Sequence, residues 1–136
     1  MTDKEFEALK KLASGSYLEI NDATVVRLTA TLPKKYQEFC DILSNEILIL
    51  KKLINEKDKK YADLYKDLKL NHKRTMDSKS DFDAFINSDD SYYDILVKIS
   101  KQEVIVSWLE ATINNIKSCG FATKNYLDLQ KFFSGA

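Results

Sequence analysis

Lysine residues recur every seven positions through the middle of the chain. Lys52, Lys59, Lys66 and Lys73 form this pattern, and Lys69 lies one helical turn from the last two. On a helix the spacing places a positive charge about every 10 Å along one side, because each residue rises about 1.5 Å. Such a pattern can follow the phosphate backbone of a nucleic acid without reading its bases.

Two further side chains extend this candidate nucleic-acid surface. Tyr65 lies beside the lysines, and an aromatic ring there can stack on a base, as in sequence-tolerant single-strand binders. Arg74 lies at the end of the pattern. A second interpretation stays open, because lysine at the outer position of a coiled coil also solvates helices that bind nothing.

Charge is unevenly distributed along the chain. The 136 residues hold 21 Lys and Arg against 21 Asp and Glu, so the net charge is zero, which by itself argues against a nucleic-acid binder. Residues 51–75, however, hold nine basic and four acidic side chains, whereas residues 76–103 hold three and seven. Charges act over about 8 Å at physiological salt, so a neutral chain can still carry a local anion-binding surface.

A heptad pattern predicts the long helix that carries these lysines. Its ten positions alternate at spacings of four and three, and only Lys57 interrupts the apolar series. The seam consists of Tyr36, Cys40, Leu43, Ile47, Leu50, Ile54, Lys57, Tyr61, Leu64 and Leu68. A second apolar set lies beside it: Phe39, Ile42, Ile49 and Leu53. The wide apolar arc predicts two neighbours, which are either other subunits or the chain's own C-terminal helices.

The N-terminal part of the chain is predicted as a short helix followed by the long one. Residues 1–20 comprise an amphipathic helix over 3–13 and a linker. The long helix spans 21–71, with Asn21 or Asp22 as its N-cap.

A proline and a polar stretch interrupt the helical pattern. Pro33 must either kink the long helix or start a new one. Residues 72–80 are predicted as a polar loop, and a short helix over 81–87 follows, capped by Ser80 or Asp81.

The C-terminal part, residues 81–136, is predicted to contain oligomerisation helices. Ser88–Ser91 begins a helix whose apolar residues recur at spacings of three and four. Gly120 fits a helix C-terminus, where glycine accepts a positive φ at little cost, and a last helix covers 121–133.

Composition favours an all-α fold in a single domain over residues 1–136. Three glycines and one proline leave little material for the many turns of a sandwich or barrel. Hydrophobic residues make up 44%, which excludes wholesale disorder.

Patterns for catalysis and metal binding are missing from the sequence. The single histidine, His72, lies in a polar lysine-rich stretch, and no Gly-rich phosphate loop occurs. The aspartates of residues 76–94 do not follow the order of a calcium-binding loop. We therefore expect no enzyme activity, no cofactor and no metal.

Cysteine usage and the N-terminus indicate a cytoplasmic protein. Cys40 and Cys119 have no metal-ligand spacing and are expected to be reduced thiols. The N-terminus lacks the apolar core of a signal peptide, and no apolar run approaches the roughly 20 residues of a membrane span. No membrane contact is expected.

The C-terminal segment resembles a known family. Residues 113–124 read INNIKSCGFATK and are followed by the aromatic finish Lys131–Phe133. This segment is similar to the end of the UvsY family, the recombination mediators of tailed phages. Asn21–Thr24 and Tyr36–Phe39 lie in similar places, and the resemblance covers roughly residues 20–133.

The resemblance implies a definite function. Members of the UvsY family bind single-stranded DNA, a RecA-like recombinase and a single-strand-binding protein, and they help load recombinase onto strands that the latter coats. They are all-helical, form homo-oligomeric rings of about six or seven subunits, and hydrolyse nothing.

These implications and the residue patterns together define the hypothesis. The DNA-binding residues are predicted to be Lys52, Lys59, Lys60, Tyr65, Lys66, Lys69, Lys73 and Arg74. The oligomerisation residues are predicted to be Leu43, Ile47, Leu50, Ile54, Trp108, Leu109, Ile113, Ile116, Phe121 and Phe132. The leading hypothesis is a recombination mediator in the host-cell cytoplasm. The alternative is a structural coiled-coil adaptor with no nucleic-acid role.

Overall fold

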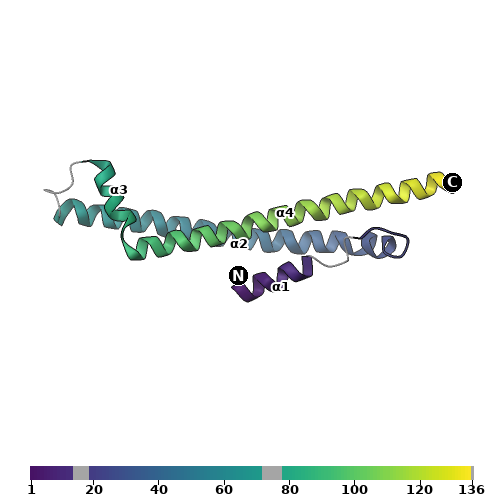
Figure 1. The fold of residues 1–136 in the computed structure, drawn as a ribbon, viewed down its shortest axis with the longest axis horizontal. Helices are drawn as coiled ribbons and strands as arrows, with labels where there is room; N and C mark the ends of the chain where they lie inside the picture. Colours follow the sequence, from purple (N-terminus) through teal and green to yellow (C-terminus); the bar gives the residue numbers. More distant parts are fainter. Residues whose placement is uncertain (14–18, 72–77, 136) are drawn as a thin grey trace. The chain divides into compact units, whose positions relative to one another are not determined.

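Most of the residues that the structure describes are helical. The computed structural model describes residues 1–13, 19–71 and 78–135, and these contain four helices and no strand (Figure 1). The helices are α1 (Asp3–Ala13), α2 (Val25–Asn71), α3 (Lys79–Asn87) and α4 (Asp90–Phe133). None of the described helices has a stretch long and apolar enough to span a bilayer. The all-α prediction is confirmed, whereas the ring assembly stays a prediction.

Contacts along the chain divide it into two compact units. The first unit comprises Met1–Glu46 and Ile105–Ala136, and the second comprises Ile47–Val104. The helices α2 and α4 therefore each contribute one stretch to each unit. A single domain over residues 1–136 stays a prediction.

A mainly aliphatic core holds the first unit together. Its buried residues are Leu28, Leu32, Phe39, Ile105, Leu109, Ile113, Ile116 and Cys119. The short helix α1 lies against this core through Phe6 and Leu9. The Phe6 ring meets Trp108 edge-on, with 5.4 Å between the ring centroids. The predicted apolar spacings of α1 and α4 thus bury side chains against the first half of α2.

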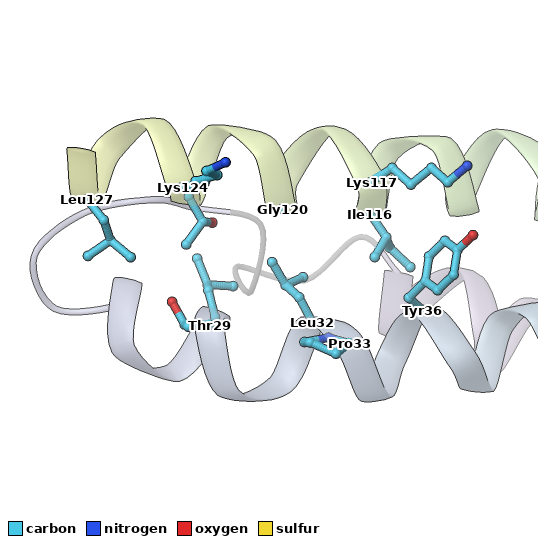
Figure 2. Close-up of a pocket in the computed structure, with 11 residues that line it drawn as sticks. Thr29, Leu32, Pro33, Tyr36, Ile116, Lys117, Gly120, Lys124 and Leu127 are labelled. Carbon is cyan, nitrogen blue, oxygen red and sulfur yellow. The ribbon is translucent and has the colours of Figure 1, made fainter. Parts of the chain in front are cut away.

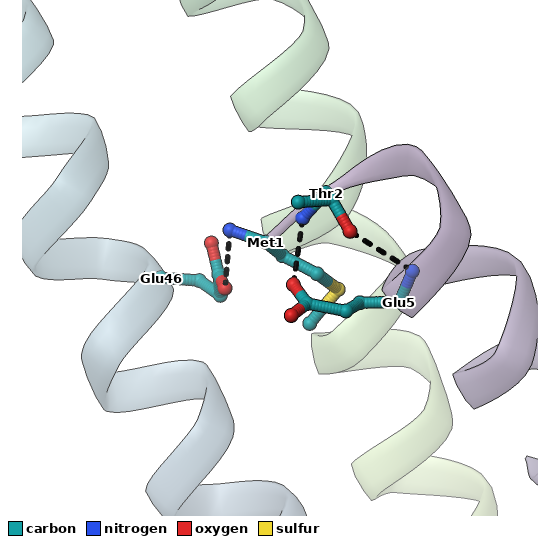
Figure 3. Close-up of polar contacts among 4 residues, drawn as sticks. All are labelled: Met1, Thr2, Glu5 and Glu46. Carbon is teal, nitrogen blue, oxygen red and sulfur yellow. Dashed lines mark hydrogen bonds and ion pairs between the residues drawn. The ribbon is translucent and has the colours of Figure 1, made fainter.

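Reciprocal hydrogen bonds begin both α1 and α2. The Thr2 amide donates to Glu5 Oε2 at 2.8 Å, and the Glu5 amide donates to Thr2 Oγ1 at 3.2 Å (Figure 3). The backbone donor of Thr2 lowers the pKa of the Glu5 carboxyl. Before α2, the amides of Asn21 and Thr24 each donate to the other's side chain at 3.0 Å. These are capping boxes, and of the two predicted N-caps Asn21 has this role.

Polar contacts between distant parts of the sequence fix the first unit further. The terminal ammonium of Met1 pairs with the Glu46 carboxylate at 3.4 Å, and both groups are almost fully buried (Figure 3). Asp22 accepts hydrogen bonds from the side chains of Tyr126 and Gln130 on α4. The contact with Asp22 raises the pKa of the Tyr126 phenol.

Two positions differ from the predicted helix boundaries. The helix α2 continues through Pro33, so no new helix begins there. The prediction that Gly120 ends a helix is wrong, because α4 runs unbroken to Phe133 and Gly135 is the glycine with positive φ among the described residues. Glycine inside a helix costs about 1 kcal/mol, and burial of Cys119 and Thr123 on either side offsets it.

A smaller, aromatic core holds the second unit together. Its buried residues are Leu68, Ile86 and Tyr92, and five partly buried side chains surround them: Tyr61, Leu64, Tyr65, Phe82 and Leu96. The rings of Tyr65 and Phe82 are 4.7 Å apart between centroids. This core joins the second half of α2 to α3 and the start of α4.

The helix α3 begins earlier than predicted. Ser78 is its N-cap and accepts a hydrogen bond from the Asp81 amide at 3.3 Å, so the cap is neither Ser80 nor Asp81. The helix starts at Lys79, within the predicted loop; residues 72–77 of that loop lie outside the described residues.

The predicted start of the next helix is confirmed at residues 88–91. The helix α4 begins at Asp90, and the side chain of Asp89 accepts a hydrogen bond from the Tyr92 amide at 3.0 Å. An N-terminal aspartate of this kind satisfies an amide that the helix itself leaves unpaired.

The heptad seam of α2 faces inward along its whole length. All ten seam positions, Lys57 included, are buried or half-buried. Of the second apolar set, Phe39 is buried and Ile42 packs against the core of the first unit, whereas Ile49 is 38% exposed. The chain's own α1 and α4 therefore cover the upper part of the wide arc.

Candidate nucleic-acid interface

Four of the predicted DNA-binding lysines lie on one exposed side of α2. Lys52, Lys59, Lys66 and Lys69 are exposed, while the seam on the other side of the helix is covered. We call these four residues the lysine row. Because α2 is continuous through Asn71, the row keeps the spacing that the sequence predicts. Lys73 and Arg74 lie outside the described residues.

An acidic residue of the same unit lies close to Lys60. Lys60 is half-buried, and its positive charge contributes to a lowered pKa of the Asp89 carboxyl. The larger causes of that lowered pKa are hydrogen bonds from the Ser91 hydroxyl and the Tyr92 amide. The Asp89 carboxylate, between α3 and α4, is therefore within electrostatic range of a lysine that was predicted to contact phosphate. Sequence spacing cannot find this pair, because 29 positions separate the two residues.

Lys57 also has an acidic neighbour. Its Nζ lies 3.6 Å from Asp58 Oδ1. Because the Asp58 side chain is exposed to solvent, this ion pair is worth little. Lys57 occupies the one charged position of the seam and is half-buried there.

Tyr65 is part of the second unit's core rather than a free ring on the surface. Its ring stacks on Tyr61 with 6.3 Å between centroids and an interplanar angle of 17°. It also packs on Phe82. Stacking of a base on Tyr65 stays a prediction, and an incoming base would have to join or displace these two rings.

A hydrogen bond ties α3 to α2 beside these rings. The Tyr61 hydroxyl donates to Asp83 Oδ1 at 2.6 Å. This hydrogen bond is the main cause that raises the pKa of the Tyr61 phenol, because ionisation would place a second negative charge beside Asp83. The contact ties α3 to the seam side of α2, which is the side opposite the lysine row.

A shallow hollow near the start of the lysine row combines positive charge with apolar surface. It has a volume of about 440 Å³ and is lined by Leu48, Ile49, Lys51, Lys52 and Asn55. Leu48 is 64% exposed. A base can lie on such an apolar surface while its phosphate meets a lysine. The sequence placed Ile49 in the second apolar set of the long helix but did not predict this hollow.

The predicted oligomerisation residues fall into two groups. Leu109, Ile113 and Ile116 are buried in the core of the first unit, so their apolar character is explained within one chain. Half-buried positions are Leu43, Ile47, Leu50, Ile54 and Trp108. Phe121 and Phe132 are 69% and 75% exposed. The role of all these residues in assembly stays a prediction.

An apolar groove lies between α2 and α4 in the first unit. Figure 2 shows Leu32, Pro33 and Tyr36 on α2 facing Ile116 and Leu127 on α4. The volume is about 380 Å³. Two lysines of α4, Lys117 and Lys124, stand at its edge, and Lys117 Nζ lies 5.8 Å from the centre of the Tyr36 ring. We call this feature the α2–α4 groove.

The described residues contain no set of side chains arranged to bind a metal ion. No group of three or more His, Cys, Asp or Glu side chains is placed there to hold an ion. Cys119 is buried, and burial raises the pKa of its thiol, which makes it less nucleophilic.

Comparisons with known proteins point in one direction. The model of a protein family described as recombination, repair and ssDNA binding protein UvsY matches residues 16–136. The fold is similar to the crystal structure of the bacteriophage T4 recombination mediator protein UvsY, with a TM-score of 0.76 and 13% sequence identity. That match covers 97% of this chain and 98% of the T4 chain. No curated protein matches the sequence.

Proposed function

Because this chain belongs to the UvsY family, we propose that it is a recombination mediator that binds single-stranded DNA without sequence preference. In this proposal it helps load a RecA-like recombinase onto strands coated by a single-strand-binding protein, in homologous recombination and repair. It acts without hydrolysing a substrate, in the cytoplasm of the host cell.

The exposed lysine row on α2 is the observation that carries this proposal. Four lysines on one side of a continuous helix can each meet a phosphate, and none of them reads a base edge. The hollow beside Lys52 adds an apolar place for a base. These features support binding that depends on charge and tolerates any sequence.

A homo-oligomeric ring of about six or seven subunits completes the proposal. One subunit offers only a few phosphate contacts, so its own affinity is low. Subunits joined in a ring hold many such sites at a high effective concentration along one strand. A strand bound in this way is displaced from the single-strand-binding protein locally, which gives the recombinase a place to begin.

A salt titration with a labelled oligonucleotide tests DNA binding. The logarithm of the association constant should fall linearly with the logarithm of the salt concentration, by about 0.7 for each phosphate neutralised. Replacing Lys59, Lys66 and Lys69 by Gln should flatten the slope by up to about 2. The matched control replaces Lys98 and Lys101, which are exposed on α4 of the same unit, and should leave the slope unchanged.

Two results would contradict DNA binding at this surface. Binding that is absent at low salt would favour the structural adaptor without a nucleic-acid role. A slope that the Lys59, Lys66 and Lys69 substitutions leave unchanged would place the DNA elsewhere on the molecule.

Loading is tested separately from binding. A RecA-like recombinase is added to DNA that a single-strand-binding protein already covers, and the lag before its DNA-dependent ATPase activity is measured. The wild-type chain should shorten the lag, and the Gln variant of the lysine row should not. A lag that the wild-type chain leaves unchanged would remove the mediator role while leaving DNA binding intact.

A further inference from the structure

A row of positive charge does not by itself select single strands. Lysines release more counterions from a duplex, about 0.9 for each phosphate contacted, than from a single strand, about 0.7. The exposed lysine row would therefore hold double-stranded DNA at least as well as a single strand. Selection of single strands needs, in addition, a surface that an unpaired base can reach.

The aromatic side chain beside the row is already engaged. Tyr65 is half-buried, and its ring packs on Phe82 at 4.7 Å and stacks on Tyr61 at 6.3 Å between centroids. A base that stacked on Tyr65 would have to break into the core of the second unit. The contact for an unpaired base is therefore expected on another apolar surface next to the lysines.

The lysine row has an uncharged side and an acidic side. On the uncharged side, an exposed residue without charge recurs every seven positions: Leu48, Asn55 and Ala62. On the other side, Glu56 and Asp63 are exposed. Carboxylates repel phosphate, so a strand that follows the lysines lies toward the uncharged side.

Leu48 is the large apolar residue of the uncharged side. Its side chain is 64% exposed and belongs to neither of the two cores. It lines the hollow of about 440 Å³ that also contains Lys52 of the lysine row. At about 100° per residue, Leu48 lies within roughly 40° of Lys52 around the helix. Its apolar surface contributes little to folding and is open to a ligand that the lysine attracts.

The chemistry of this hollow matches a single nucleotide. The flat face of a base can lie on Leu48 and Ile49, while phosphates on either side meet the exposed Lys51 and Lys52. The amide of Asn55 has both donors and an acceptor, so it can meet the edge of any base. In a duplex the bases are paired and stacked on one another, and their faces cannot reach such a hollow.

We propose that the hollow at Leu48 holds an unpaired base and thereby makes the protein selective for single-stranded over double-stranded DNA. This inference rests on the proposed DNA binding at the lysine row, with which the hollow shares Lys52. The lysine row supplies the affinity that depends on phosphates. The hollow supplies the affinity that depends on exposed bases.

Three nucleic-acid probes test the proposal. They are a labelled oligothymidylate, the same oligonucleotide with abasic residues at alternate positions, and a duplex with the same number of phosphates. The wild-type chain should bind the intact oligonucleotide about three- to tenfold more tightly than the abasic one, because part of each base leaves water. It should also prefer the intact single strand to the duplex.

Substitutions of Leu48 should change this discrimination in both directions. Leu48→Ser should bring the ratio of intact to abasic affinity close to one and remove the preference over duplex. The salt slope should stay unchanged, because no phosphate contact is lost. Leu48→Trp should raise the ratio above that of the wild type, because an aromatic ring stacks on bases. The matched control Val104→Ser, at a side chain 62% exposed on α4 of the same unit, should keep the wild-type ratio.

The outcomes separate this inference from DNA binding itself. Replacing Lys59, Lys66 and Lys69 by Gln should weaken binding of all three probes and keep the ratio of intact to abasic affinity. A wild-type chain that binds intact and abasic strands equally, or a Leu48→Ser variant that keeps the wild-type ratio, would overturn the role of the hollow and leave DNA binding at the lysine row standing. An unchanged ratio with an altered assembled mass in native mass spectrometry would make the hollow a protein contact and overturn the proposal as well. Binding of no probe at low salt would remove both the inference and the proposed function.

Discussion

The two units of the chain have cores of different size and composition. The first unit has a mainly aliphatic core of eight buried residues, all from α2 and α4, and α1 packs against it through partly buried side chains. The second unit has three, surrounded by aromatic rings, with a hydrogen bond from Tyr61 to Asp83. The exposed lysine row and Asp89, between α3 and α4, both belong to the second unit. The difference indicates that the first unit supplies most of the stability and the second presents charge.

The largest expected effect is a cavity in the first unit. Leu109 is fully buried, and Leu109→Ala should lower the free energy of unfolding by about 3–5 kcal/mol. Ile86→Ala makes a cavity of similar chemistry in the smaller core of the second unit and should cost less, about 2 kcal/mol. Urea denaturation followed by circular dichroism measures both. Equal losses would remove the proposed difference in stability between the units.

The contact of α1 with the rest of the first unit provides a smaller effect. Phe6→Ala removes the edge-on contact with Trp108 and should cost about 1–2 kcal/mol. Trp108 is the single tryptophan of the chain, so its fluorescence emission should move to longer wavelength as water reaches it. The control Leu12→Ala removes an exposed apolar residue of the same helix and should leave the emission unchanged. An unshifted spectrum in Phe6→Ala would mean that α1 does not cover the indole in solution.

What the sequence could predict depends on how local the signal is. The heptad seam and the lysine row are repeated every few residues, and both keep their predicted sides on α2. The prediction that Gly120 ends a helix was wrong because the free-energy cost of a glycine inside a helix is smaller than the stabilisation from the side chains that pack around it. The Lys60–Asp89 proximity and the α2–α4 groove join residues far apart in sequence, so they exist only once the helices pack. The N-cap of α3 was predicted at Ser80 or Asp81 and lies at Ser78. The side chains of all three residues can accept a hydrogen bond from a helix amide, so the sequence does not distinguish them.

Removing the negative charge of Asp89, between α3 and α4 in the second unit, is expected to strengthen DNA binding. Asp89→Asn removes the carboxylate near Lys60, while asparagine still caps α4 as well as aspartate does. Affinity for single-stranded DNA at low salt should rise about two- to threefold, because a negative charge that repels phosphate in the neighbourhood of Lys60 is removed. Glu110→Gln makes the same charge change at an exposed position in the first unit and should have no such effect. An equal rise in both variants would show that net charge, rather than the position of Asp89, limits binding.

The smallest expected effect concerns two tyrosine–aspartate contacts, one in each unit. Tyr61→Phe and Tyr126→Phe remove the hydrogen bonds to Asp83 and Asp22 respectively. Tyr61→Phe should lower the urea midpoint more, because the second unit has fewer buried apolar residues to hold it. A larger loss from Tyr126→Phe would reverse the comparison between the units.

The pH dependence of these contacts follows from the direction of their pKa shifts. Both phenols have a pKa raised above the ordinary 10.0, so the folded state favours the protonated form. Their stabilisation is therefore fully present below about pH 10 and is lost as the pH rises through the raised value. The midpoint difference between wild type and Tyr61→Phe should stay constant from pH 6 to about pH 9 and shrink above about pH 10. The exposed Tyr93 is the control, since its Phe variant should track the wild type at every pH. A difference that persists unchanged at high pH would mean that Tyr61 acts through its ring packing and not through its bond to Asp83.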